Sequence, residues 1–155
     1  MTATSHRLQA AAAGAEKVTL VEASAPSQER ALENAAENGL AERVEALTGD
    51  AFALLKQLRA ERRRFDLVIA DPPAFIKRRK DQKTGLEAYQ RLNRMAMQVL
   101  ERDGLLVSAS CSYHLGREQL RELLLSGARH LDRSLQLIGE GHQGPDHPVH
   151  PAIPE

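Results

Sequence analysis

Short apolar runs alternate along the chain with longer stretches in which apolar residues recur every three to four positions. Runs such as FDLVIA at 65–70 are typical of buried strands, and the longer stretches are typical of amphipathic helices. The pattern predicts strands at 17–22, 43–48, 65–70, 105–109 and 134–138, and helices at 26–38, 51–63, 85–102 and 116–130. This alternation predicts an α/β fold with a doubly wound, Rossmann-like parallel sheet.

Composition narrows the class of protein. The 155 residues suit one domain, and a hydrophobic content of 42% is enough for a core of Leu, Val, Ile and Ala. Because 21 basic residues balance 21 acidic ones, any contact with nucleic acid must depend on a local basic patch. The single cysteine excludes an internal disulfide. With no recognisable signal peptide or membrane-spanning stretch, the sequence predicts a cytoplasmic protein with no membrane partner.

The sharpest local feature is Asp71-Pro72-Pro73, which directly follows the strand predicted at 65–70. Two prolines fix the backbone and so hold the Asp71 carboxylate and the nearby carbonyl groups in one geometry. Such a loop could clamp a flat base or an amine, with Phe75 stacking beside it. The alternative is a rigid turn that only ends the strand.

The only cysteine, Cys111, lies between Ser110 and Ser112, just past the strand predicted at 105–109. A thiolate there could add to an electron-poor ring carbon. A lone cysteine is more often a small buried hydrophobe, which is the competing interpretation. Because the carboxyl ends of parallel strands meet at one edge of a sheet, we expect Cys111 and Asp71 to face the same cavity.

Two other strand ends carry acids. Glu22 ends the first predicted strand and could accept hydrogen bonds from both hydroxyls of a ribose. Asp50 follows Gly49 at the end of the second strand, where it could read the edge of an adenine or cap the following helix. Both roles of Asp50 can hold together.

The loop after Asp71-Pro72-Pro73 is basic, with Lys77, Arg78 and Arg79 in succession. These residues could hold the phosphates of a polynucleotide, although such a run is usually a solvated loop. Histidines also recur near the C-terminus, interleaved with prolines that favour an extended segment over a metal site: His142, His147 and His150.

With these residues placed, the chain resembles the S-adenosylmethionine-dependent 23S rRNA (cytosine-C5) methyltransferase family. The resemblance covers nearly the whole chain from Gln9 onward. Its stretches are AAAAGAEKVTLVEAS, ERALENAAENGL, RVEALTGDAF, FDLVIADPPAFIKRRKD, GLLVSASCSYHL and DHPVHPAIPE.

The resemblance implies a class I methyltransferase fold, S-adenosylmethionine as cofactor and large-subunit rRNA as partner. It further implies that the Cys111 thiolate adds to C6 of a cytosine so that C5 can accept a methyl group, and that the target base leaves its stack. The implied roles are cofactor binding for Glu22, Asp50, Ala51, Asp71 and Pro72, catalysis for Cys111 and Asp71, and substrate binding for Pro73, Phe75, Lys77, Arg78 and Arg79.

The chain departs from this family at both ends. Where the family has a first strand and a glycine turn, this chain has MTATSHRL, with no glycine before Gly14. We therefore expect residues 1–155 to be a partial methyltransferase domain that lacks the first and last strands, with an atypical N-terminus at 1–8 and an extended tail at 139–155. Open strand edges then predict self-association and weak or absent activity.

Two alternatives stay open at this point. One is a non-catalytic remnant that binds RNA or a protein partner, which the missing glycine turn favours. The other is an amino-methyltransferase, because Asp71-Pro72-Pro73 resembles the acid-Pro-Pro loop of enzymes that methylate exocyclic amines without a cysteine.

Overall fold

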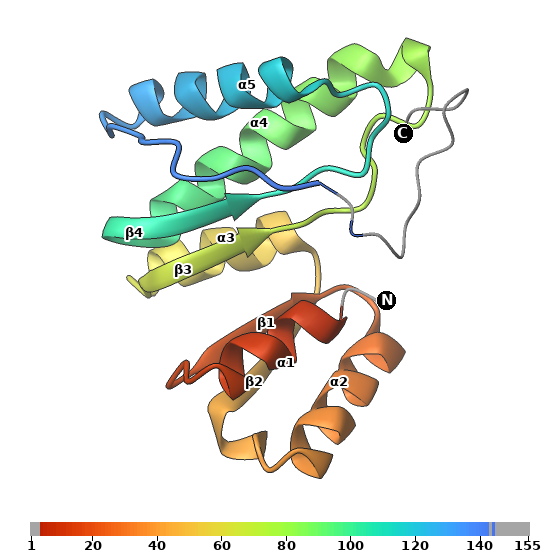
Figure 1. Ribbon diagram of the computed structural model, residues 1–155, viewed down its shortest axis with the longest axis vertical. Coiled ribbons are helices and arrows are strands. Elements are labelled where there is room, and N and C mark those ends of the chain that lie inside the picture. The colour runs from red at the N-terminus through yellow and green to blue at the C-terminus, as the bar shows by residue number, and fades with distance from the viewer. Residues whose placement is uncertain (1–3, 143, 145–155) are drawn as a thin grey trace. The chain divides into compact units, whose positions relative to one another are not determined.

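A computed structural model describes residues 4–142 and residue 144. The chain divides into two compact units, each described here by itself. The first unit runs to Leu67 and includes Val99–Leu105, and the second comprises Val68–Gln98 and the chain from Leu106 onward. The helices and strands, seen in Figure 1, are α1 (Thr4–Ala12), β1 (Val18–Glu22), α2 (Ala25–Glu37), η1 (Ala41–Arg43), β2 (Val44–Thr48), α3 (Ala51–Ala60), β3 (Phe65–Ala70), η2 (Arg79–Asp81), α4 (Gln82–Val99), β4 (Leu100–Ser108) and α5 (Arg117–His130).

The first unit is built on the parallel pair β1 and β2, in register from Val18 opposite Val44 to Glu22 opposite Thr48. Helix α2 begins at the cap residue Ser24, which suits a helix with proline in its first turn. Small residues let helix and sheet approach closely, so the core is made of Ala11, Leu20, Ala31, Ala35 and Val44.

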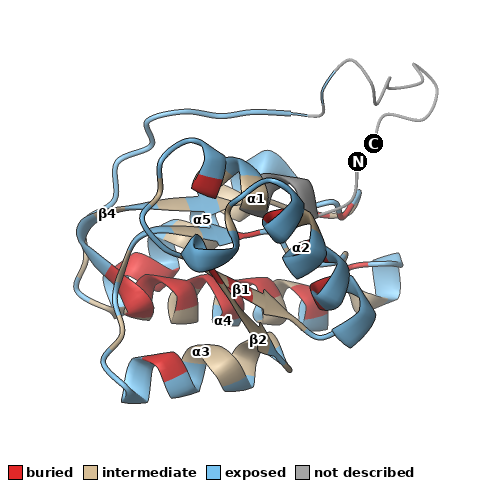
Figure 2. Cartoon of the chain, turned by 90° about the horizontal axis from the view of Figure 1, so that it is seen from below, coloured by how far each residue is buried: buried red, intermediate tan, exposed pale blue. Residues whose placement is uncertain are grey.

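In the second unit, helix α4 carries more of the buried positions than any other element (Figure 2). Strands β3 and β4 pair with each other, and their arrows run in the same direction (Figure 1). Helix α4 connects them, as a crossover between parallel strands requires. Among the described residues β1 pairs only with β2 and β3 only with β4, so the strands form two separate pairs.

The predicted fifth strand at 134–138 is wrong. The segment is irregular, and Leu137 and Ile138 are 64% and 77% exposed. Its alternating pattern suits a half-buried strand, but no described strand pairs with it. Polar contacts hold it instead: the Arg133 guanidinium donates to the carbonyl of Met97, and Glu140 pairs with Arg121.

Two further differences concern helix ends. Residues 4–12 form helix α1, which the pattern did not predict. Helix α4 ends at Val99 and strand β4 begins at Leu100, whereas we expected a helix to residue 102 and a strand from residue 105. Within β4, Asp103 has a φ of 63°, in the left-handed region. None of the described helices is long and apolar enough to cross a lipid bilayer.

Candidate active site

The ends of β3 and β4 bring two segments together: residues 71–75, which we call the acid-proline loop, and the segment that carries Cys111. The amide of Ala109 donates to the carbonyl of Ala70 at 2.9 Å, which continues the pairing one residue beyond the end of β4. Two residues further on, the Sγ of Cys111 lies 3.9 Å from the carbonyl oxygen of Pro72. Cys111 is exposed, so it is not the small buried hydrophobe of the competing interpretation.

A buried tyrosine fixes the backbone on both sides of this cysteine. Ser110 Oγ donates to the Tyr89 hydroxyl at 2.9 Å, and the Tyr89 hydroxyl lies 2.8 Å from Ser112 Oγ. The amide of Ser112 donates back to Ser110 Oγ at 3.1 Å, which closes a ring of hydrogen bonds. We call Tyr89, Ser110 and Ser112 the tyrosine–serine ring. Because Tyr89 is 0% exposed and Ser112 is 6% exposed, water competes little for these bonds.

The same ring reaches the loop that follows the prolines. The amide of Ile76 donates to Ser112 Oγ at 3.2 Å, and the Phe75 ring meets the Tyr89 ring edge-on at 4.8 Å between centroids. Hence one buried hydroxyl cluster holds both segments of the site, although Ile76 and Ser112 lie 36 positions apart in the sequence.

A close approach of α4 completes this support. A Cβ placed on Gly85 would lie 2.3 Å from Ile76 Cγ1 and 2.9 Å from the Phe75 carbonyl oxygen. Only glycine therefore lets the first turns of α4 pack against the loop in this arrangement. The loop is confined by α4 on one side and tied to the tyrosine–serine ring on the other.

Sequence reasoning missed these supporting residues. Tyr89 lies at helical spacing from Leu86 and Leu92, so the sequence pattern shows it only as one more apolar position of the helix. The available signal was chemical, because a buried tyrosine hydroxyl needs a hydrogen-bond partner. The serines on either side of Cys111 were the available partners.

The acids predicted to bind a nucleoside lie side by side in the first unit. Glu22 faces Thr48 in the register of β1 and β2, and the amide of Gly49 donates to the Glu22 carbonyl at 3.0 Å. The Glu22 carboxylate accepts from the amide of Ser24 at 3.0 Å. Gly49 has a φ of 155°, which glycine adopts without strain and which turns the chain into α3.

Asp50 caps helix α3, as one of its two proposed roles required. Its carboxylate accepts from the amide of Ala53 at 2.9 Å. Ala51 is the first residue of α3 and is half-buried. Glu22, Asp50 and Ala51 therefore occupy neighbouring strand ends, which is where an α/β sheet binds its ligands.

An ion-pair cluster strengthens the sheet of the first unit. The Glu45 carboxylate pairs with Lys17 Nζ at 3.0 Å and with Arg63, and accepts from Thr19 Oγ1 at 2.6 Å. Partial burial raises the pKa of Glu45, but the hydrogen bonds from Thr19, Arg63 and Lys17 outweigh it and lower the pKa to about 2. The sequence pattern gave no sign of this cluster.

The basic residues after the loop are exposed. Arg78 pairs with Asp81 at 3.7 Å, whereas Lys77 and Arg79 have no ion pair recorded within the described part of the chain. Among those residues no group of three or more histidine, cysteine or acidic side chains could hold a metal ion. His142 lies in the irregular segment, and His147 and His150 fall outside the described residues.

Comparison with known proteins finds one family model and several relatives that are named methyltransferases. A model of the family described as "conserved hypothetical protein 95" matches residues 3–115. Ribosomal RNA large subunit methyltransferase I of Shewanella denitrificans is 34% identical over 149 residues, which cover 96% of this chain and 38% of that protein. The chain therefore spans well under half the length of this curated relative.

Solved structures agree on the fold. The putative methyltransferase SMU.776, complexed with SAH, superposes with a TM-score of 0.67 at 24% identity, over 77% of this chain and 31% of that one. The SAM-dependent methyltransferase of Agrobacterium tumefaciens gives a TM-score of 0.63 at 26% identity, over 77% of this chain and 39% of that one. The Rossmann-like fold expected from the alternation of strands and helices is thus confirmed.

Proposed function

Because the chain belongs to the family of conserved hypothetical protein 95, we propose that it is an S-adenosylmethionine-dependent methyltransferase domain that acts on large-subunit rRNA. The observation that carries this proposal is the exposed Cys111 thiol, 3.9 Å from the carbonyl of Pro72 at the adjoining ends of β3 and β4. The similarity to an rRNA methyltransferase supports the substrate class, and the SAH complex of a neighbour supports the cofactor.

The residues at the ends of β1 and β2 suit a nucleoside. Glu22 offers a carboxylate to two ribose hydroxyls, and Asp50 with the backbone of Ala51 offers an edge to adenine. Asp71 and Pro72 are proposed to contact the methionine part of the cofactor. S-adenosylmethionine, when bound, supplies an electrophilic methyl group on a sulfonium.

Cytosine C5 is a weak nucleophile, and the thiol addresses this difficulty. We assign to Cys111 the addition of its thiolate to C6, which breaks the C5–C6 double bond and turns C5 into an enamine carbon. C5 would then take the methyl group as the bond between that group and the sulfonium sulfur breaks, which leaves S-adenosylhomocysteine. Loss of the C5 proton to solvent then expels the thiolate and restores the ring. Asp71 accepts a hydrogen bond from the base, while Pro73 and Phe75 pack against it and Lys77, Arg78 and Arg79 hold phosphates.

The test is methyl transfer to large-subunit rRNA from labelled S-adenosylmethionine, followed by analysis of the methylated nucleoside. The expected product is 5-methylcytidine. The C111A variant should lose at least ~1,000-fold in rate, because it removes the bond-forming group. Tyr113→Phe, at a neighbouring exposed position, is the matched control and should keep the rate.

A covalent trap separates this mechanism from the alternatives. With 5-fluorocytidine in the RNA, C5 carries no proton to lose after methylation, so the RNA should stay bonded to the protein. The complex should require both Cys111 and the cofactor. A methylated exocyclic amine, formed at full rate by C111A, would instead identify an amino-methyltransferase. RNA binding with no transfer at all would identify a non-catalytic module.

A further inference from the structure

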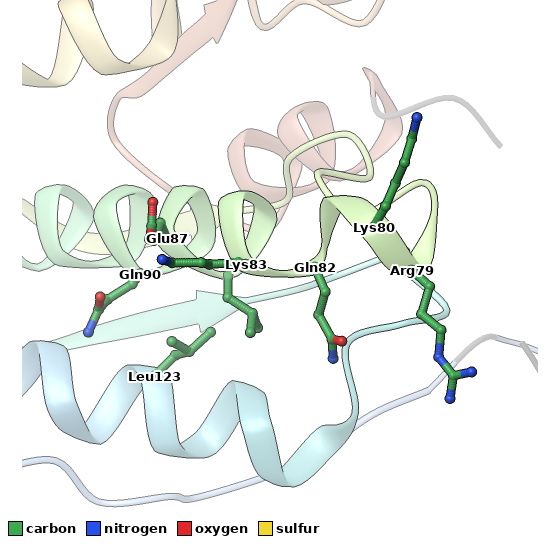
Figure 3. A pocket seen from close by; sticks show the side chains of 8 residues that line it. Arg79, Lys80, Gln82, Lys83, Glu87, Gln90 and Leu123 are labelled. Atoms are coloured by element: carbon green, nitrogen blue, oxygen red, sulfur yellow. The ribbon is translucent and has the colours of Figure 1, made fainter.

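Outside the candidate catalytic edge, the second unit has an open groove of about 490 Å³ between the first turns of α4 and helix α5. Arg79, Gln82, Lys83 and Gln90 line it at roughly helical spacing, and Leu123 enters from α5 (Figure 3). Arg79 and Gln82 point toward α5, whereas Lys80 points the other way. The residues assigned above to substrate binding include only Arg79 from this groove.

The groove and the catalytic loop rest on the same core. Leu86 and Leu123, the apolar lining of the groove, pack against the cluster of Ile76, Tyr89 and Leu115. Phe75, at the end of the acid-proline loop, packs against that cluster as well. Arg79 lies four positions after Phe75, so the acid-proline loop and the groove are no more than about 14 Å apart along the chain.

The charges of the lining favour an anionic strand. Arg79 and Lys83 stand against one acid, Glu87, and neither cation forms an ion pair within the described residues. Gln90 donates to Ser126 Oγ at 3.3 Å, which links α4 to α5 at one end of the groove. Proteins that bind single-stranded nucleic acid combine a positively charged groove, which holds the phosphates, with side chains against which the bases lie.

We propose that this groove binds the single-stranded RNA that flanks the target nucleotide. Arg79 and Lys83 contact phosphates, and Leu86 and Leu123 accept the face of an unstacked base. The strand leaves the acid-proline loop past Lys77 and enters the groove within a few nucleotides. This inference rests on the proposed RNA substrate and adds a second contact surface that determines which flanking sequence is held.

The test measures binding of a fluorescein-labelled single-stranded RNA of about a dozen nucleotides, long enough to occupy the site sizes typical of single-strand binders. K83A should raise Kd about 3- to 10-fold at low salt and reduce the slope of log K against log salt by about 0.7, as expected for one lost phosphate contact. Lys56→Ala, another exposed helical lysine, lies in the first unit and should change neither value.

Leu123→Ala tests the apolar floor and should raise Kd at an unchanged salt slope, because it removes a surface for a base and leaves the charges in place. Unchanged Kd and salt slope in K83A would overturn the proposal. So would equal competition by polyglutamate of matched charge, which would indicate an acidic protein partner. Methyl transfer by the wild-type chain is scored separately. Transfer with an unaltered KM for RNA in K83A refutes the groove alone, whereas a K83A effect without any transfer refutes the proposed activity alone.

Discussion

The two regions that carry candidate site residues are held in place by different means. In the first unit, the carboxylates of Glu22 and Asp50 are oriented by hydrogen bonds from residues two and three positions away, namely the amides of Ser24 and Ala53. In the second unit, the acid-proline loop and Cys111 are fixed by Tyr89, which lies 23 positions before Ser112. Local contacts position the proposed nucleoside site, and a tertiary network positions the proposed chemistry.

The roles proposed for the two regions account for this difference. A carboxylate that accepts hydrogen bonds from a ribose tolerates small displacements, so strand ends and helix caps are sufficient. A nucleophile must meet one ring carbon within a few tenths of an ångström, and its supports must be locked by packing. The closed ring of hydrogen bonds around Cys111 meets that need.

The largest expected effect comes from breaking this ring. Tyr89→Phe keeps the aromatic packing but deprives Ser110 and Ser112 of a partner in a buried site. We expect the free energy of unfolding to fall by about 1–3 kcal/mol, the usual cost of buried polar groups left unpaired. Urea denaturation measures this free energy, and the rate of methyl transfer by Tyr89→Phe should also fall.

The control for that prediction is Tyr113→Phe, because Tyr113 is 61% exposed and its hydroxyl is not part of the tyrosine–serine ring. Its effect should stay within about 0.5 kcal/mol. A double-mutant cycle of Tyr89→Phe with Ser112→Ala should show coupling, since the two hydroxyls are in contact. Additive effects would show that the ring does not act as a unit.

A smaller effect should follow from crowding the loop. Gly85→Ala in a helix would ordinarily stabilise by about 1 kcal/mol. The Cβ would lie 2.9 Å from the Phe75 carbonyl, a backbone atom that cannot turn aside. Overpacking of this kind costs about 1–3 kcal/mol, so we expect a net loss of up to about 2 kcal/mol together with reduced methyl transfer.

Helix α5 offers a matched control. A Cβ on Gly127 meets its nearest neighbours, Arg94 and Met97, at 4.0 Å, which is ordinary contact. Gly127→Ala should therefore be neutral or stabilising by up to about 1 kcal/mol. If both variants were stabilised equally, the close approach of α4 to the loop would be refuted as a constraint.

The same contrast explains what the sequence could predict. Strand β3 was predicted with its observed bounds, and the cap at Asp50 was one of two roles given for that residue. Both depend on short-range patterns. The expectation that Cys111 and Asp71 face the same cavity depended on a general rule for parallel strands, which needs no knowledge of side-chain contacts. The structure shows Cys111 Sγ 3.9 Å from the carbonyl of Pro72, the residue after Asp71.

The failures at Tyr89, Gly85 and residues 134–138 concern partners that are distant in sequence. Tyr89 reads as one more apolar position in its helix, so its hydroxyl bonds were invisible. Gly85 reads as an ordinary glycine, because no pattern shows what its missing Cβ would strike. The alternation at 134–138 reads as a strand, but alternation does not supply the neighbouring strand on which a ladder depends.

The smallest expected effect is on the free energy of unfolding at low pH, and it depends on a carboxylate of the first unit. The folded-state pKa of Glu45 is lowered to about 2, below the ordinary value of 4.5. Its contribution is therefore fully present above pH 4.5 and is lost as the pH falls toward 2. Because Glu45 remains partly exposed, solvent screening limits the contribution to about 1 kcal/mol.

Glu45→Gln should lower stability at neutral pH, and its urea midpoint should converge with that of the wild type as the pH approaches 2. Glu29→Gln, at an exposed carboxylate on α2, should follow the wild type throughout. A gap between Glu45→Gln and the wild type that persists at pH 2 would show that the carboxylate acts by packing and not by charge.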